Sequence, residues 1–180
     1  MKIGISGHTQ GIGKAIYDLL STDHDVIGFS RSNGYDITIK DQREKLISEV
    51  ENCDVFINNA YAIKAQTELL KTFCNKWQND INKLIVHMGS KWIFHPPPDY
   101  PQHRLYRKEK QDQEKIIKQY ITSYAPKVCN IILGPTDTDM TKDWNIPKIS
   151  TEAVALIVSN IINTKDHVYT QQVILDATSK

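Results

Sequence analysis

Residues 2–13, with the sequence KIGISGHTQGIG, constrain the fold more than any other part of the chain. Lys2–Ser6 is a short apolar run of strand type, and from Gly11 onward apolar residues recur at helical spacing. Gly7, Gly11 and Gly13 therefore lie where a strand gives way to a helix. Glycine adopts positive φ and lets backbone approach a ligand, and a helix start offers unpaired N–H groups to a phosphate. The stretch predicts a dinucleotide pyrophosphate site, with a purely steric turn as the alternative.

Composition and charge limit the classes of partner. The chain has 180 residues, of which 40% are hydrophobic and 24% charged, as is typical of a folded globular protein. This length predicts a single domain over residues 1–180. A formal net charge of +1 provides no field for capturing nucleic acid or an anionic membrane, so neither partner is expected. No apolar run is long enough to span a bilayer.

The cysteines and the N-terminal residues bear on location. Cys53, Cys74 and Cys129 lie far apart and form no paired motif, so they are expected to be buried thiols in a reducing compartment. Met1 leads directly into the first strand, so no signal peptide is expected. These features predict a cytoplasmic protein.

Strand and helix patterns alternate along the chain. After the first pair, strands are predicted at residues 26–29, 53–57, 84–88, 128–133 and 168–175. Helices are predicted at residues 40–50, 66–77 and 105–124, and a last helix opens at Ser150 with a capping hydroxyl. This order predicts an α/β protein with a doubly wound, mostly parallel sheet, the Rossmann fold, in three α/β/α layers.

Three segments need separate interpretation. No full helix fits between Arg31 and Tyr35, so one crossover is predicted to be reduced to a loop. The segment His95–His103 holds four of the seven prolines and is predicted to be an extended loop. Its two histidines lack a third ligand at a recognisable spacing, so no metal site is expected. In the helix that follows, Glu109 and other acids alternate with basic residues, which is typical of a solvated face.

Polar residues follow two strands at the edge where open α/β sheets bind ligands. Arg31 is the only charged residue between Ile27 and Asn33. A guanidinium suits a 2′-phosphate, which favours NADP over NAD, and a surface arginine beside a turn is the alternative. Asn58 and Asn59 follow the third strand and are expected to lie at the same ligand edge.

Ser90, Tyr106 and Lys110 form a candidate catalytic set. Tyr106 and Lys110 are four residues apart on one predicted helix and therefore share a face. An ammonium near a phenol favours the phenolate, so Lys110 is expected to lower the pKa of Tyr106 toward the range of efficient proton transfer. Ser90, at the end of a strand, is placed to donate a hydrogen bond to the same substrate oxygen. A tyrosine and a lysine four residues apart are expected by chance in a chain of this composition. The pair supports a catalytic set because it follows the glycine turn, the asparagine pair and the Ser90 strand in this order.

Taken together, these motifs resemble those of the short-chain dehydrogenase/reductase family, and the resemblance runs nearly from end to end. Ser90, Tyr106 and Lys110 fall on the family's catalytic positions. The positions that resemble its cofactor-binding residues are Gly7, Thr9, Gln10, Gly11, Ile12, Gly13, Ser30, Arg31, Asp36, Ile37, Asn58, Asn59, Ala60, Tyr106, Lys110, Gly134, Pro135, Thr136 and Thr138.

The resemblance implies an NADP(H)-dependent oxidoreductase that transfers hydride to or from a small carbonyl or alcohol substrate, with Tyr106 as the acid/base. It also implies a homodimer or homotetramer formed through the helices at residues 66–77 and 105–124. Flanking aromatic residues would favour a flat or aromatic substrate, or close a small core; they are Trp92, Phe94, His95 and Trp144.

The chain departs from the family pattern in several places, among them Ser6 where threonine is usual and the reversed order of Gly134 and Pro135. Tyr61 replaces the glycine of the Asn-Asn-Ala-Gly motif, and the crossover after the second strand is reduced. The region after Met140 is short, and no asparagine stands at the expected position on the helix before the Ser90 strand. The alternative function is therefore a catalytically weak or inactive NADP(H)-binding sensor or scaffold.

Overall fold

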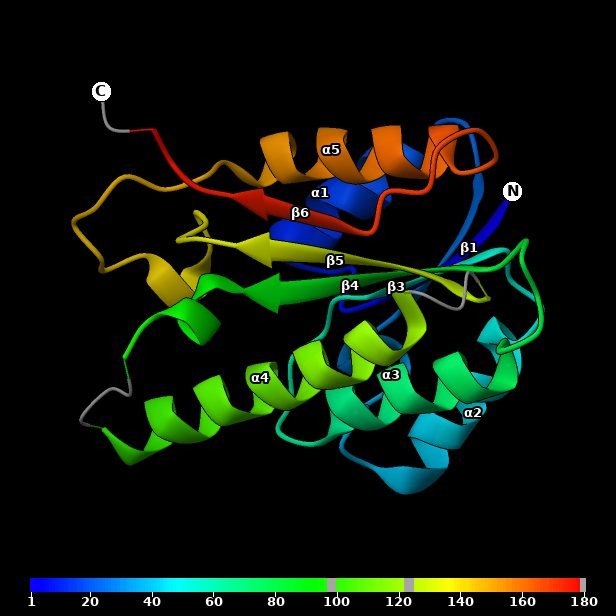
Figure 1. Ribbon diagram of the computed structural model, residues 1–180, viewed down its shortest axis with the longest axis horizontal. Helices are drawn as coiled ribbons and strands as arrows, with labels where there is room; N and C mark the ends of the chain where they lie inside the picture. The colour runs from blue at the N-terminus through cyan, green and yellow to red at the C-terminus, as the bar shows by residue number, and fades with distance from the viewer. Residues whose placement is uncertain (97–99, 122–124, 179–180) are drawn as a thin grey trace.

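The computed structural model describes residues 1–96, 100–121 and 125–178, and they form one twisted sheet between two layers of helices (Figure 1). Six strands pair in the order β2-β1-β3-β4-β5-β6, and all five pairings are parallel. The strands are β1 (Lys2–Ser6), β2 (Asp25–Phe29), β3 (Val55–Asn58), β4 (Leu84–Ser90), β5 (Lys127–Leu133) and β6 (Gln172–Leu175). The predicted doubly wound α/β fold is confirmed.

Helices cover both faces of the sheet (Figure 1). One face carries α1 (Gly11–Leu20) and α5 (Thr151–Thr164), and the other carries α2 (Lys40–Val50), α3 (Ala65–Lys76) and α4 (Pro101–Ile121). In β3, Val55 and Ile57 pack with the α1 and α5 side, whereas Phe56 between them packs with the α2 and α3 side. Because side chains of a strand alternate between two covered faces, most residues of the interior strands are apolar.

The prediction of a crossover reduced to a loop needs a correction: no α-helix fits between Arg31 and Tyr35, as predicted, but α2 supplies the helix of the connection from β2 to β3. Between β2 and α2 the chain makes only a short 3₁₀ turn, η1 (Arg31–Asn33), before it continues to β3 on the far side of β1. This leaves β2 at one edge of the sheet.

Several predicted boundaries need correction. Helix α4 begins at Pro101, so the prediction of an extended loop to His103 is wrong at its last three residues; proline is tolerated in a first helical turn, where its missing N–H would have no partner. Residues 97–99 of that loop, and 122–124 at the predicted helix end, lie outside the described residues. Only Gln172–Leu175 of the predicted last strand is extended in the sheet.

The three cysteines are buried free thiols, as predicted. The large apolar side chains of α3, including Leu69, Phe73 and Trp77, are also buried within the chain itself. These buried side chains of α3 form no exposed apolar patch for a second subunit. Oligomer formation through α3 and α4 therefore stays a prediction. Within the described ranges, no helix has the length and apolar character needed to cross a membrane.

Candidate active site

The turn between β1 and α1 has the backbone geometry that its glycines predict. Gly7 and Gly11 have φ values of 76° and 51°, a region that side chains disfavour. A Cβ at Gly13 would lie 1.9 Å from the carbonyl oxygen of Gly7, so only glycine permits this close approach. Helix α1 starts without a side-chain cap and with no acid in its first turn. Its first N–H groups are therefore suited to an anion.

Residues after β3 and β5 close around this turn. Asn59 Nδ2 donates to the carbonyl oxygens of Ser6 at 3.0 Å and Gly7 at 3.1 Å. Ser6 Oγ in turn accepts hydrogen bonds from the N–H groups of Asn59 and Ala60, both at 3.1 Å. Thr138 Cγ2 would lie 3.2 Å from a Cβ on Gly11. The predicted glycine, asparagine and threonine motifs thus meet at one edge of the sheet.

Asn58 needs a correction. Its side chain is 0% exposed, and Nδ2 donates to the carbonyl oxygen of Gln66 at 3.0 Å. The predicted direct contact between the Asn58 side chain and a cofactor is therefore wrong, because the protein encloses it completely. Ile37, one of the positions that resemble the family's cofactor-binding residues, also packs in the core.

The turn after β2 is organised around Asn33. Its Oδ1 accepts from the Ser30 N–H and its Nδ2 donates to the Gly28 carbonyl oxygen, both at 2.8 Å. Ser30 Oγ lies 2.8 Å from Ser32 Oγ, while Arg31 is exposed. The turn therefore presents one guanidinium and hydroxyl groups on a fixed backbone.

Asp36, next along the chain, accepts hydrogen bonds from the Thr38 hydroxyl at 2.7 Å and the Thr38 N–H at 2.9 Å. These bonds lower the pKa of Asp36, so it stays ionised.

The structure brings Ser90, Tyr106 and Lys110 together. Ser90 is the last residue of β4, and its hydroxyl hydrogen-bonds with the Tyr106 side chain and accepts from the Trp92 N–H at 3.3 Å. Lys110 Nζ lies 5.7 Å from the centroid of the Tyr106 ring. It donates to the Met88 carbonyl oxygen at 2.8 Å, which ties α4 to β4.

The titration of this set differs from the prediction. Lys110 is only 4% exposed, and burial lowers its pKa to about 7, with the charge of Glu109 opposing that change. Burial raises the pKa of Tyr106 and outweighs the hydrogen bond from Ser90. The predicted lowering of the Tyr106 pKa is therefore wrong, since desolvation of the phenol dominates and the buried ammonium is itself weakened.

Two residues that contact the candidate catalytic set were not predicted as part of the site. Tyr61 packs edge-on against Tyr106, with 4.9 Å between ring centroids, and Lys110 Nζ lies 5.4 Å from the Tyr61 ring. Glu109 was expected on a solvated face but is 8% exposed and accepts from the Lys64 N–H at 2.5 Å and the Thr67 hydroxyl at 3.0 Å. The departure from the glycine motif was a signal for Tyr61; no signal marked Glu109.

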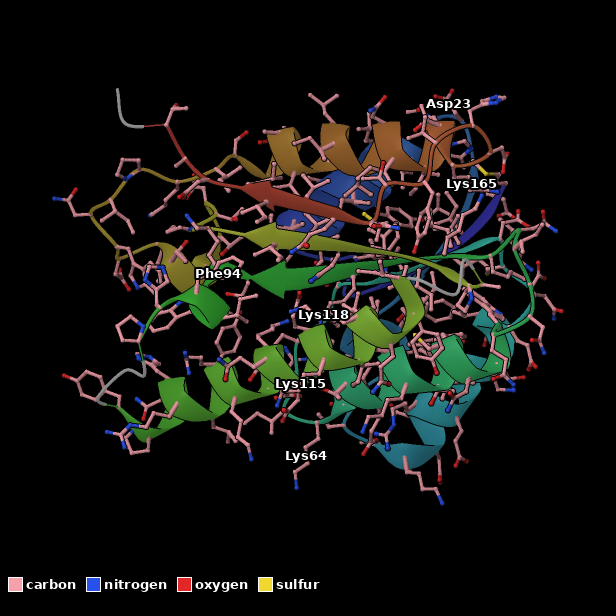
Figure 2. The ribbon with its side chains drawn as sticks, viewed as in Figure 1. Asp23, Lys64, Phe94, Lys115, Lys118 and Lys165 are labelled. Atoms are coloured by element: carbon pink, nitrogen blue, oxygen red, sulfur yellow. The ribbon has the colours of Figure 1, made fainter. Side chains whose placement is uncertain are left out.

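Glu109 also explains a backbone distortion at the start of α3. Lys64 has a φ of 64°, unusual for a residue with a side chain, and its N–H points to the Glu109 carboxylate. Figure 2 shows the Lys64 side chain extending away from the body of the protein. The buried carboxylate therefore holds the first turn of α3 against α4 near Lys110.

The segment after β5 forms one wall of the site edge. Gly134 N–H donates to the Leu175 carbonyl oxygen at 2.9 Å, and the buried Thr136 hydroxyl donates to the Gly134 carbonyl oxygen at 3.1 Å. Pro135 accepts from the Ile149 N–H at 2.8 Å. This segment, together with the exposed Phe94 of η2 (Lys91–Phe94), lies at the carboxyl edge of the sheet (Figures 1 and 2).

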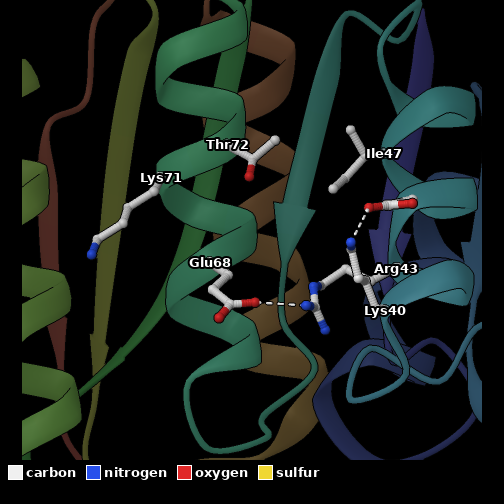
Figure 3. Close-up of a pocket in the computed structure, with 7 residues that line it drawn as sticks. Lys40, Arg43, Ile47, Glu68, Lys71 and Thr72 are labelled. Carbon is white, nitrogen blue, oxygen red and sulfur yellow. Dashed lines mark ion pairs between the residues drawn. The ribbon is translucent and has the colours of Figure 1, made fainter.

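Other parts of the described chain offer less. No group of three or more potential metal ligands occurs among the described residues. A groove between α2 and α3 contains the ion pairs Arg43–Glu68 at 2.8 Å and Lys40–Glu44 at 3.7 Å (Figure 3). None of the predicted site residues lines it, and these charges already have partners.

Comparison with solved structures identifies the fold. The 3-alpha-hydroxysteroid dehydrogenase from Pseudomonas sp. B-0831, complexed with NADH, superposes with a TM-score of 0.78 over 97% of this chain and 94% of its own, at 15% sequence identity. The chain has the short-chain dehydrogenase/reductase fold. A short chain dehydrogenase from Burkholderia cenocepacia J2315 in complex with NADP gives a TM-score of 0.75 over 98% and 88% of the two chains, at 14% identity.

A 4-hydroxyisoleucine dehydrogenase complexed with NADH gives a TM-score of 0.78 over 98% of this chain and 97% of its own, at 15% identity. No family model matches the sequence, and no curated protein matches it. At these identities the likeness concerns the fold, and the chemistry has to be argued from the residues.

Proposed function

We propose that this protein is an NADPH-dependent oxidoreductase of the short-chain dehydrogenase type that reduces a small carbonyl substrate. The observation that carries the proposal is the assembly of Ser90, Tyr106 and Lys110 at the same sheet edge as the glycine turn. Structural neighbours that are complexed with NADH or NADP support a nicotinamide cofactor.

The glycine turn fits a dinucleotide. Gly7 and Gly11 place no side chain at either end of the turn, and the start of α1 offers N–H groups to the pyrophosphate. Arg31 and the hydroxyls of Ser30 and Ser32 would hold a 2′-phosphate. This arrangement supports the preference for NADP(H).

When bound, the reduced cofactor supplies the hydride. Tyr106 provides the proton: its raised pKa keeps the phenol protonated at neutral pH, which is the form that donates to a carbonyl oxygen during reduction. Ser90 orients the phenol through their hydrogen bond. Lys110 uses two of its three N–H groups on Gln66 and Met88, which leaves one for a ribose hydroxyl.

The experiment is NADPH consumption measured against a panel of aldehydes and ketones, with Tyr106→Phe as the matched variant. Phenylalanine keeps the ring against Tyr61 but removes the proton. Turnover should fall by on the order of 10²-fold or more while NADPH affinity stays near that of the wild type. Equal turnover by the two proteins would refute Tyr106 as the acid.

A second candidate, an NADP(H)-binding sensor or scaffold with weak or no catalysis, is favoured by Tyr61. Its ring occupies space directly against Tyr106 and Lys110, where the motif it departs from has glycine. For this candidate, calorimetry would detect NADPH binding, no carbonyl on the panel would be reduced, and Tyr106→Phe would have no effect. Reduction of any panel compound that depends on Tyr106 excludes it.

A further inference from the structure

Behind Lys110 lies a cluster of neutral polar side chains that are enclosed almost completely. Asn58, Gln66 and His87 are 0% exposed and Gln113 is 1% exposed. They come from β3, α3, β4 and α4, so the cluster joins the elements that carry the candidate catalytic residues. Burying this many polar groups is costly unless each has a partner, so the directions of their hydrogen bonds are informative.

The hydrogen bonds of His87 run in one direction. Burial lowers the pKa of His87 to about 3, so the imidazole is neutral and has one donor and one acceptor nitrogen. Asn58 Nδ2 lies 3.3 Å from His87 Nδ1, and an amide nitrogen can only donate, so Nδ1 is the acceptor. His87 Nε2 therefore carries the hydrogen and donates to Gln113 Oε1 at 3.0 Å.

The same direction continues to Gln66. Because Gln113 Oε1 accepts from His87, Gln113 Nε2 faces the other way and donates to Gln66 Oε1 at 3.4 Å and to the Thr67 hydroxyl at 2.9 Å. Gln66 Nε2 donates to the Asn58 carbonyl oxygen at 3.0 Å. A flipped Gln66 amide would place its oxygen against that carbonyl and its nitrogen against two donors, so its orientation is fixed.

The Gln66 carbonyl fixed in this way is the side-chain acceptor of Lys110, with Lys110 Nζ donating to Oε1 at 2.7 Å. The other acceptor is the Met88 carbonyl oxygen at 2.8 Å, which belongs to the β4 backbone. Gln66 is in the first turn of α3, the turn that the Glu109 carboxylate holds against α4. Two successive residues of α4, Glu109 and Lys110, therefore both hydrogen-bond to the start of α3.

We propose that Gln66 is a positioning residue for Lys110: its side-chain carbonyl, locked by the buried hydrogen-bond chain through Gln113, His87 and Asn58, accepts from the ammonium, favours its charged form against the effect of burial, and directs it toward Tyr106. This inference rests on the proposed function, in which Lys110 acts in turnover. The family pattern has an asparagine on the helix before the Ser90 strand, and this chain lacks it at the expected position. Gln66, on that same helix, supplies a side-chain amide to Lys110.

Two variants of nearly the same length separate positioning from packing. Gln66→Glu keeps an acceptor and adds a negative charge, whereas Gln66→Met fills similar space and accepts nothing. A hydrogen bond to a charged group is typically worth enough to move the titration midpoint by about 1 to 2 pH units. We therefore expect the Lys110 midpoint to rise in Gln66→Glu and to fall in Gln66→Met. Gln113→Met is the matched control, because it breaks the buried cluster without touching Lys110, and it should shift the midpoint less.

The measurement is an NMR titration of the ¹³Cε and ¹⁵Nζ signals of Lys110, assigned by their loss in Lys110→Met, in the protein without added ligand. Opposite shifts in the two Gln66 variants support the proposal. Midpoints that move in the same direction, or that move no further in Gln66→Met than in Gln113→Met, overturn it. This readout does not require turnover, so absence of carbonyl reduction would count against the proposed function alone.

Discussion

Lys110 is a buried lysine, and its replacement by methionine tests the electrostatics of the site directly. The side chain is 4% exposed and its pKa is lowered to about 7, whereas an unfolded chain has the ordinary lysine value. Between these two pKa values the unfolded state binds more protons than the folded state. The free energy of unfolding contributed by Lys110 therefore rises with pH above 7, and between pH 7 and pH 9 it should rise by roughly 2 kcal/mol.

The assay is urea unfolding of the wild type and Lys110→Met at both pH values. The wild type should gain roughly 2 kcal/mol on going from pH 7 to pH 9 relative to the variant. The variant also leaves Gln66 and Met88 without the lysine donor, so its stability at a single pH combines two opposing effects. The difference between the two pH values removes that ambiguity.

Lys108→Met is the control, because Lys108 is an exposed lysine on the same helix. Its pH dependence should match that of the wild type. If Lys110→Met and the wild type respond equally to pH, then Lys110 is not desolvated as the structure indicates.

Two further predictions follow from named contacts. The wild-type protein should bind NADPH roughly ten- to a hundredfold more tightly than NADH. Arg31→Ala should remove that difference and leave the NADH affinity almost unchanged, as measured by calorimetric titration of both cofactors. An equal loss of affinity for both cofactors would show that Arg31 is only a surface charge. Burial lowers the pKa of His87 to about 3, so as the pH falls below about 6.5 this histidine takes up a proton in the unfolded state before it does so in the folded state. The free energy of unfolding should therefore decrease toward pH 4, and it should decrease less in His87→Gln. Unchanged acid sensitivity of this variant in denaturant titrations would contradict a buried neutral His87.

The sequence was sufficient where local pattern decides structure. A strand that stops at Gly7 and a helical period that starts at Gly11 are both visible within a dozen residues, and the structure confirms them. The absence of an α-helix between Arg31 and Tyr35 was predictable for the same reason, since too few residues separate them. The start of α4 was missed because Pro101 also suits a helix N-terminus.

The parts of the site that escaped prediction depend on contacts between distant segments. Gln66 and Lys110 are 44 positions apart in the sequence, and only the packing of α3 against α4 brings Gln66 to Lys110 and the Glu109 carboxylate to the first turn of α3. The sign of the Tyr106 pKa change was wrong because spacing reveals a neighbouring charge and says nothing of burial. Desolvation of the Tyr106 phenol exceeds the lowering effect of the Ser90 hydrogen bond, and burial also lowers the pKa of Lys110.

The turn after β2 and the candidate catalytic set belong to different parts of the sheet. The turn follows β2, the edge strand of the order β2-β1-β3-β4-β5-β6, and carries Arg31. Ser90 ends the interior strand β4 and pairs there with Leu133 of β5, and the Tyr106 helix packs on both of these strands. Under the proposed function, changes in the turn would therefore affect recognition of the cofactor's adenosine end, while the groups that would move the proton are carried by β4 and α4.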